Sequence, residues 1–209
     1  DFLIDVEPEA PILAATKKNS VQRIVSYHSF QPDIADVATA WSTLSALSDG
    51  ITKVAVTVND ADDAISVWSL VQRAGQDGRE IIPIAMGEAG KWTRILGLAH
   101  GAFLTYAALE SGSEVAPGQI SVRDMIDVFR VKELNEETKV YGIIAGNTSY
   151  TMSPYVHNAA FKSAGINSVF VPLQVNDLDA FIRRMVKAET REVELNFHGF
   201  SVTNPHKQS

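Results

Sequence analysis

Strand-length apolar segments alternate along this chain with segments of helical periodicity, and this alternation restricts the fold more than any other feature. The strand-length segments, such as residues 81–86, are apolar at consecutive positions instead of at every second one. Strands of this kind are buried on both faces, as in a parallel sheet that helices cover. The sequence therefore predicts an α/β fold built from repeated strand–helix units.

The N-terminal part of the chain contains the longer series of these units. Strands are expected at residues 2–6, 22–27, 51–58, 81–86 and 101–105, and helices at residues 32–47, 60–74, from 92 onward, and 122–134. Ser121 is expected to cap the last of these helices, because its hydroxyl can accept a hydrogen bond from the first turn. This series predicts one parallel sheet with its helices.

A polar, acidic segment at residues 134–138 is predicted to be a linker between two domains. After it, strands are expected at residues 140–145, 168–173 and 199–203, and helices at residues 153–164 and 178–187. Pro154 suits the first turn of a helix, and Gly165 suits the residue that ends one. We therefore place the domains at residues 1–133 and 139–209.

Composition excludes several classes of function. The 209 residues are 45% hydrophobic and 21% charged, with a net charge of −7 and no cysteine. The negative net charge argues against a general nucleic-acid partner, since phosphate binding needs a basic face. Without cysteine, the chain can form neither a disulfide nor a thiolate metal site. No apolar run reaches the ~20 residues of a membrane-spanning helix, and no secretion signal precedes the acidic N-terminus. We expect a cytoplasmic protein with no membrane or nucleic-acid partner. Because the chain has no initiator methionine, we also expect a piece of a longer protein.

Two stretches, residues 26–30 and 52–56, each read as the C-terminal end of a buried strand. Each places one ionisable residue, His28 or Lys53, where the apolar run is predicted to stop. A lysine in an apolar run is costly to bury as an ammonium, which favours a neutral amine that can form an imine with a ketone. A histidine at the end of a neighbouring strand could transfer protons near neutral pH. Each residue alone has a plainer explanation, as a surface lysine and a structural histidine. Together they predict imine catalysis at the C-terminal edge of a parallel sheet.

Residues 1–133 resemble type I 3-dehydroquinate dehydratase in four motifs that follow the family's order. They are Ser-Tyr-His-Ser-Phe at residues 26–30, Lys-Val-Ala-Val at 53–56, Thr-Arg-Ile-Leu-Gly at 93–97 and Ala-Pro-Gly-Gln-Ile-Ser at 116–121. The resemblance implies a (β/α)8 barrel, of which this chain would supply a partial barrel with about the last five strands. Where the family commonly has a serine before the last motif this chain has Val115, and Ser113 is the candidate to replace that contact.

The same resemblance implies the roles of four residues. Lys53 would form the imine with 3-dehydroquinate, and His28 would transfer the protons of the reaction. Arg94 would bind the substrate carboxylate through its planar fork. Gln119 would hydrogen-bond substrate oxygens and help to close the site, with a turn-capping amide as the alternative.

Residues 139–209 resemble the substrate-binding N-terminal part of shikimate dehydrogenase. The motifs are Tyr-Gly-Ile-Ile-Ala-Gly-Asn at residues 141–147, Met-Ser-Pro-Tyr-Val-His-Asn-Ala-Ala-Phe at 152–161, Val-Phe-Val-Pro-Leu at 169–173 and Gly-Phe-Ser-Val-Thr-Asn-Pro-His-Lys at 199–207. The resemblance implies that Thr151 and Ser153 bind the carboxylate of shikimate at a helix N-terminus. Thr203 would bind ring oxygens, and Lys207 would act as the catalytic acid–base group beside the reacting carbonyl. The plainer alternatives are a helix cap for Ser153 and a terminal surface lysine for Lys207.

Together the two resemblances imply a bifunctional lyase and oxidoreductase of aromatic amino-acid biosynthesis, with 3-dehydroquinate, 3-dehydroshikimate and shikimate as its small-molecule substrates. The parent protein is expected to use NADP(H). This chain contains no Gly-x-Gly-x-x-Gly and is expected to bind neither a cofactor nor a metal itself. A plastid location is expected if the parent is a plant protein, and the assembly state stays open, a homodimer included. Two alternatives are an inactive quinate- or shikimate-binding regulator and another imine-forming barrel such as a class I aldolase.

Overall fold

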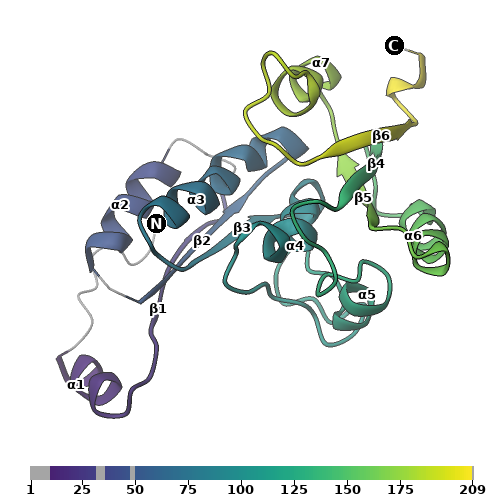
Figure 1. Ribbon diagram of the computed structural model, residues 1–209. Coiled ribbons are helices and arrows are strands. Elements are labelled where there is room, and N and C mark those ends of the chain that lie inside the picture. Colours follow the sequence, from purple (N-terminus) through teal and green to yellow (C-terminus); the bar gives the residue numbers. More distant parts are fainter. Residues whose placement is uncertain (1–9, 32–35, 48–49, 209) are drawn as a thin grey trace.

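The structure is a computed structural model that describes residues 10–31, 36–47 and 50–208 (Figure 1). The strand expected at residues 2–6 and the start of the helix expected from residue 32 lie outside these ranges. Within them, two parallel three-stranded sheets follow one another along the chain. The predicted α/β class is therefore confirmed, and we refer to residues 10–133 as the first unit and residues 139–208 as the second unit.

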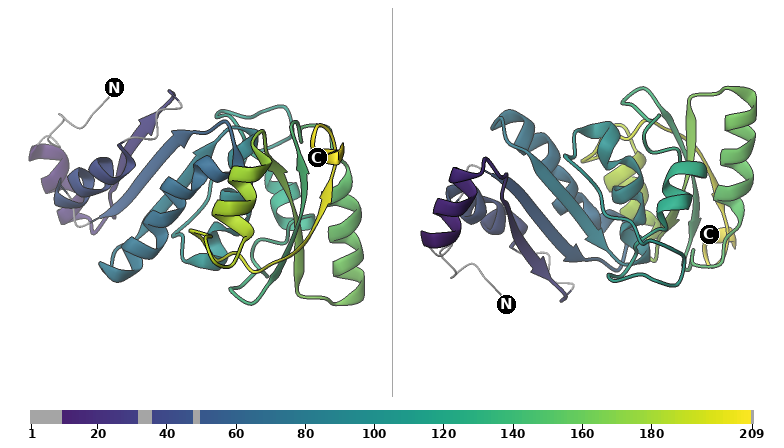
Figure 2. Two further views of the ribbon diagram at one scale, coloured as in Figure 1. Left: turned by 90° about the horizontal axis from the view of Figure 1, so that it is seen from above. Right: turned by 90° about the horizontal axis from the view of Figure 1, so that it is seen from below.

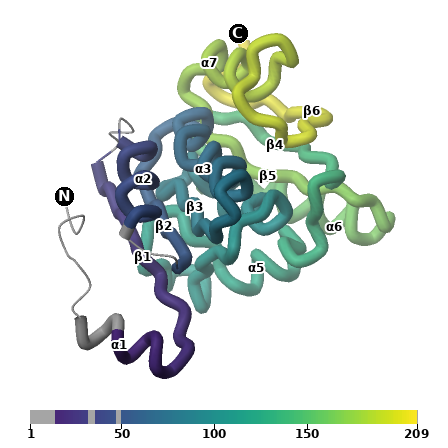
Figure 3. Tube along the Cα trace, turned by 60° about the vertical axis from the view of Figure 1, so that its left-hand side comes forward, coloured from purple at the N-terminus to yellow at the C-terminus, as the bar shows by residue number. Residues whose placement is uncertain are grey.

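The first unit is built around strands β1 (Ile24–Ser29), β2 (Ile51–Thr57) and β3 (Ile81–Met86), which pair in that order. Its helices are α1 (Ala10–Lys18), α2 (Val37–Leu47), α3 (Ile65–Gln76), α4 (Lys91–Leu96) and α5 (Val122–Asp127). Helix α1 was not predicted from the sequence. Figure 3 shows α2 and α3 side by side over one face of the sheet.

The two faces of the first sheet have different surroundings. On the outer face, Val54 and Val56 pack beneath the helices, in a core that includes Trp41, Trp68 and Trp92. The opposite face, which we call the inner face, carries a smaller apolar cluster of Ile51, Ala55, Ile82, Ile84 and Met86, with Leu104 packed against it. This division matches the two-sided burial that consecutive apolar residues predict for a parallel strand.

Three predicted elements of the first unit differ in the structure. Residues 101–105 form no strand, because only Phe103 bonds to β3, donating from its backbone N–H to the Ile81 carbonyl at 2.8 Å. The helix expected at residues 122–134 ends at Asp127. Shortly after it, Arg130 adopts a left-handed φ of 52°, and its Nη2 donates to the Ser168 carbonyl of the second unit at 2.7 Å. The helix expected from residue 60 begins as a 3₁₀ turn, Ala61–Ala64, before α3.

The second unit contains strands β4 (Lys139–Ala145), β5 (Ser168–Gln174) and β6 (Phe197–Val202) in the order β5-β4-β6. Helix α6 (Ser153–Ala164) has its predicted bounds, and Gly165 ends it with a left-handed φ of 64°, as predicted. Helix α7 (Leu178–Phe181) continues as a π-helical turn over Ile182–Val186, and a 3₁₀ turn covers His206–Gln208.

The two units share a continuous hydrophobic core. Helix α4 packs against β3 of the first sheet and also against β5 of the second sheet. The views in Figure 2 show the two sheets on either side of this helix. The fold therefore places α4, which belongs to the first unit and carries Arg94, between the two sheets. No helix in the described ranges is long and apolar enough to cross a membrane.

Candidate active site

Lys53 and His28 project from the same face of the first sheet. In the parallel pairing of β1 with β2, Lys53 lies opposite Ser26, and His28 lies opposite Ala55. Directly opposed residues share a face, as do residues two apart on one strand. Both side chains are therefore on the inner face. His28 is near the C-terminal end of β1, whereas Lys53 is the third residue of β2 and stands deeper than the sequence predicts.

The inner face favours the neutral forms of both side chains. The neighbours Ala55, Ile82 and Ile84 are almost fully buried. Burial lowers the pKa of Lys53 below its ordinary value, and the positive charge of Arg94 lowers it further. Burial also lowers the pKa of His28, to which the charge of Lys53 adds. A lowered pKa makes the neutral forms more accessible, and a neutral amine can attack a ketone while a neutral imidazole can accept a proton.

The ammonium group of Lys53 has an aromatic neighbour. Its Nζ lies 4.5 Å from the centroid of the Tyr106 ring, on the segment that follows β3. Among the described residues, Lys53 forms no salt bridge with a carboxylate. No carboxylate in the described part of the chain therefore holds this nitrogen in its charged form.

Arg94 is held at the edge of this site by backbone carbonyls. It is only 2% exposed, and burial lowers the pKa of its guanidinium to about 10, so it stays positively charged at neutral pH. Its Nη1 donates to the carbonyl of Tyr106 at 3.4 Å, and its Nη2 donates to the carbonyl of Pro117 at 3.3 Å. Its buried Nε has no partner among the described residues. The guanidinium keeps unused donor capacity for an anion.

Gln119 braces the loop at residues 115–119. Its Oε1 accepts a hydrogen bond from the backbone N–H of Val115 at 2.9 Å, which is the turn-capping role considered for it. The loop is fixed to the end of β3, since Gly87 donates its N–H to the carbonyl of Pro117 at 3.2 Å. Val115 is 89% exposed and Ser113 is also exposed, so neither supplies a buried contact in place of the family's serine.

Thr151 and Ser153 lie together at the start of α6. The hydroxyl of Thr151 accepts a hydrogen bond from the backbone N–H of Ser153 at 3.3 Å. Ser153 is the first residue of the helix, and the capping position belongs to Met152, whose side chain cannot cap it. The alternative that Ser153 caps the helix is therefore wrong, and Thr151 satisfies part of the helix end instead.

Thr203 and Lys207 follow β6. The backbone N–H of Thr203 donates to the carbonyl of Ile144 at 3.0 Å, which holds it at the C-terminal end of β4. Lys207 is exposed in the 3₁₀ turn. The neighbouring His206 is buried, and its Nε2 lies 2.7 Å from the carbonyl of Val175, which fixes this turn to the end of β5.

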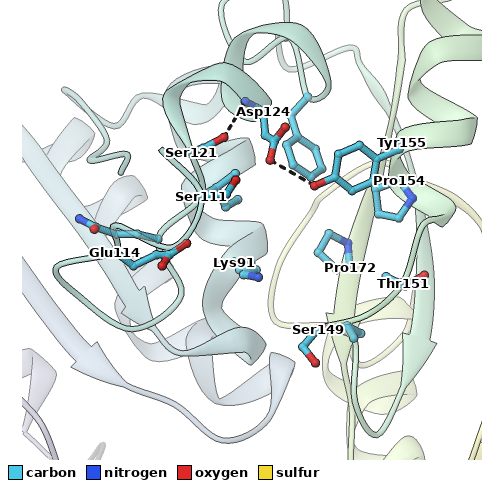
Figure 4. Close-up of a pocket in the computed structure, with 14 residues that line it drawn as sticks. Lys91, Ser111, Glu114, Ser121, Asp124, Ser149, Thr151, Pro154, Tyr155 and Pro172 are labelled. Carbon is cyan, nitrogen blue, oxygen red and sulfur yellow. Dashed lines mark hydrogen bonds between the residues drawn. The ribbon is translucent and has the colours of Figure 1, made fainter. Parts of the chain in front are cut away.

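A cavity of about 160 Å³ lies at the junction of the two units (Figure 4). Gln119 of the first unit and Thr151 of the second both line it, and Lys53, His28, Arg94, Ser153, Thr203 and Lys207 do not. On one side, the hydroxyl of Tyr155 donates to Oδ2 of Asp124 at 3.1 Å. The structure thus brings Lys53, His28 and Arg94 into one neighbourhood. Of the site residues predicted for the second unit, Thr151 is the one that lines this cavity.

Several residues of the site and of the junction were not identified from the sequence. Tyr106 belongs to an irregular segment with no motif that marks it as a partner of Lys53. At the junction, Asp60 accepts hydrogen bonds from the backbone N–H groups of Asn176 and Asp177 at 2.8 and 3.1 Å. These residues are more than a hundred positions apart in the chain, so periodicity and local spacing carry no signal of their contact.

Comparison with known proteins gives matches for both parts of the chain. Residues 2–136 match the family model for "Type I 3-dehydroquinase", and residues 143–209 match the model for "Shikimate dehydrogenase substrate binding domain". Over 195 residues, the chain is 34% identical to the bifunctional 3-dehydroquinate dehydratase/shikimate dehydrogenase, chloroplastic, of Arabidopsis thaliana; the match covers 92% of this chain and 31% of that protein.

The first unit also resembles single dehydratases. The 3-dehydroquinate dehydratase of Methanococcus maripaludis strain C5 is 35% identical over 118 residues, which are 56% of this chain and 52% of that protein. The crystal structure of 3-dehydroquinate dehydratase from Geobacillus kaustophilus HTA426 matches with a TM-score of 0.51 and 27% identity, over 58% of this chain and 48% of that chain. This match supports the partial barrel, and the chain spans only part of each of these relatives.

Proposed function

The chain belongs to the type I 3-dehydroquinase family, and we propose that its first unit is part of an enzyme that dehydrates 3-dehydroquinate to 3-dehydroshikimate. The observation that carries this proposal is the placement of Lys53 and His28 on one apolar face, where burial lowers the pKa of both. An amine that is easily deprotonated and an adjacent imidazole are the two groups that imine chemistry requires.

The reaction follows from these two groups. The neutral amine of Lys53 attacks the ketone carbon, and with one proton taken up the carbonyl oxygen leaves as water, which gives an iminium. His28 takes a proton from the adjacent carbon, and the freed electron pair forms the double bond as the neighbouring hydroxyl leaves. His28 returns its proton to that hydroxyl, which departs as a second water. Addition of one water to the iminium then releases the product, the neutral amine of Lys53 and the proton that was taken up at the start.

Arg94 is proposed to bind the carboxylate of the substrate. Its guanidinium lies close enough to Lys53 to lower the pKa of that lysine, and its Nε has no partner among the described residues. Bidentate contact between a guanidinium and a carboxylate would fix the ring relative to Lys53. We propose that the amide nitrogen of Gln119 contacts substrate oxygens, since its carbonyl oxygen is already bonded to Val115.

For the second unit, we propose binding of 3-dehydroshikimate and shikimate by Thr151, Ser153 and Thr203, with Lys207 beside the reacting carbonyl. Reduction would need NADP(H) as the hydride donor. The chain has no Gly-x-Gly-x-x-Gly sequence, the loop that holds a pyrophosphate at a helix N-terminus. We therefore do not assign the dinucleotide to residues of this chain. By analogy with its chloroplastic relative, we propose a plastid location in a plant and a cytoplasmic one elsewhere.

Borohydride trapping tests the proposed dehydration. The full chain is incubated with 3-dehydroquinate and sodium borohydride, and peptide mass spectrometry locates the reduced adduct. We expect the adduct on Lys53, its loss in Lys53→Met, and its retention in Lys132→Met, which removes an exposed lysine of the same unit. An adduct that survives in Lys53→Met would overturn the proposal, and so would the absence of an adduct with the unsubstituted chain. An adduct formed only with an unrelated ketone would favour an aldolase.

A further inference from the structure

The ring of Tyr106 is the aromatic group beside the nitrogen on which the proposed chemistry takes place. Lys53 Nζ lies 4.5 Å from the ring centroid, within the range in which the negative face of an aromatic ring attracts a cation. Tyr106 is held in this position because its carbonyl accepts a hydrogen bond from Nη1 of Arg94. The same arginine therefore anchors the backbone of Tyr106 and lies close enough to Lys53 to lower its pKa.

We propose that Tyr106 is a catalytic residue whose ring face stabilises the iminium formed on Lys53. This inference rests on the proposed dehydration. The amine is neutral when it attacks, whereas the iminium nitrogen carries a full positive charge until hydrolysis. Since the ring attracts only the charged form strongly, it stabilises the iminium more than the attacking amine, and this difference lowers the barrier to iminium formation.

The other described neighbours of Lys53 do not stabilise a positive charge on its nitrogen as the Tyr106 ring does. Two titratable side chains lie near the nitrogen of Lys53, His28 on β1 and Arg94 on α4. A positive charge on either one disfavours a positive charge on Lys53. From β3 the neighbours are the apolar Ile82 and Ile84. Among the described residues, no carboxylate forms a salt bridge with Lys53. The Tyr106 ring is therefore the contact on the described inner face that favours a cation at this nitrogen.

The test separates the ring from the hydroxyl. Tyr106→Phe keeps the ring, Tyr106→Leu removes it, and Phe103→Leu is the matched control, because Phe103 is a partly exposed aromatic residue on the same segment. Dehydration by the full chain and the pH dependence of Lys53 acylation by acetic anhydride are measured for each variant. We expect Tyr106→Phe and Phe103→Leu to stay within about twofold of the parent in turnover, and Tyr106→Leu to lose roughly three- to thirtyfold.

The pH dependence of Lys53 acylation reports the pKa of Lys53. If Tyr106 had a purely structural role, its replacement would leave that pKa unchanged. Loss of the ring removes a contact that favours the ammonium, so the pKa of Lys53 in Tyr106→Leu should fall. Acylation at neutral pH should then become faster while turnover becomes slower. Unchanged turnover and an unchanged Lys53 pKa in Tyr106→Leu would overturn the inference, and so would Tyr106→Phe behaving like Tyr106→Leu.

A second series keeps the inference testable if Tyr106→Leu does not fold. Phenylalanines with an increasing number of ring fluorines, placed at position 106, keep the shape and weaken the negative face. Turnover and the Lys53 pKa should decrease together along the series, and a flat series would overturn the inference. Failure of the proposed dehydration is distinguishable from failure of this inference, because the unsubstituted chain would then form no borohydride adduct on Lys53.

Discussion

Arg184 of the second unit and Asp62 of the first form an ion pair, with Nη1 and Oδ2 separated by 2.8 Å. Asp62 is buried within the 3₁₀ turn that follows β2, the strand that carries Lys53. Glu192 holds the other side of the guanidinium, with Nε and Oε1 2.6 Å apart. In the same turn, the carbonyl of Ala61 accepts a hydrogen bond from the indole of Trp92 on α4, two residues before Arg94. The second unit is thereby connected to elements that carry the candidate site.

Replacing Arg184 by methionine should destabilise the chain. The ion pair alone would lower the pKa of Asp62, but burial outweighs it and the pKa is raised, so the carboxylate is already costly to keep charged. Without its partner, that cost is uncompensated, and we expect a loss of about 1–3 kcal/mol in the free energy of unfolding. Urea denaturation measures it. Arg183→Met removes an exposed neighbouring arginine and should change the midpoint little; equal effects of the two variants would contradict the prediction.

His100 should make the stability fall on acidification. Burial lowers its pKa from the ordinary 6.5, although Glu136 and Glu194 act in the opposite direction, and its ring stands edge-on to Trp68 at 5.2 Å. Because the unfolded chain then binds the proton more readily, the contribution of His100 is present above pH 6.5 and is lost as the pH falls through the lowered folded value. In His100→Gln, the free energy of unfolding should therefore decrease less between pH 7 and pH 5 than in the parent. His198→Gln is the exposed control, and a parallel pH profile of parent and His100→Gln would refute the prediction.

Asn158 should be required for the edge of the second sheet. Its side chain is 1% exposed and bonds both backbone groups of Phe170, accepting from N–H at 2.8 Å and donating to C=O at 2.9 Å. Asn158→Ala leaves a buried donor and a buried acceptor unpaired on the edge strand β5, which should cost roughly 2–4 kcal/mol. Thermal and urea unfolding measure the loss. Lys162→Ala, on the exposed side of the same helix, should be close to neutral, and a comparable loss there would indicate that the helix itself is the cause.

Replacing Gly118 by alanine should weaken substrate binding at the proposed dehydratase site as well as lower the stability of the fold. Its φ is +73°, and a Cβ there would lie 2.2 Å from the carbonyl oxygen of Gly87, so an alanine would displace the loop that Gln119 braces. We expect Gly118→Ala to raise the KM for 3-dehydroquinate several-fold. Gly112→Ala is the control, because Gly112 also has a positive φ, 85°, but nothing lies within 4 Å of a Cβ. It should lose only the ~1–2 kcal/mol of a left-handed residue; a matching KM in the two variants would show that crowding at Gly118 is irrelevant.

Local patterns were sufficient where local physics decides the structure. Consecutive apolar residues identified the central strands, Pro154 and Gly165 delimited α6, and Ser121 caps α5, accepting from the N–H of Asp124 as predicted. The pattern failed at residues 101–105 and 128–134. There, apolar residues at strand or helix spacing are fixed by contacts with distant segments, such as that of Arg130 with Ser168.

The order of residues alone therefore determined the α/β class, the parallel strands, the family motifs and the candidates Lys53, His28 and Arg94. Only the tertiary structure decided that Lys53 and His28 share a face, that the amine of Lys53 lies near the Tyr106 ring, and that Gln119 and Thr151 line one cavity. The tertiary structure also determined that the ion pair between Asp62 and Arg184 connects the two units. The physical reason is that strand and helix periods are set by backbone geometry within a few residues, whereas a side chain's neighbour depends on how separate elements pack. No short stretch of sequence determines how separate elements pack against one another.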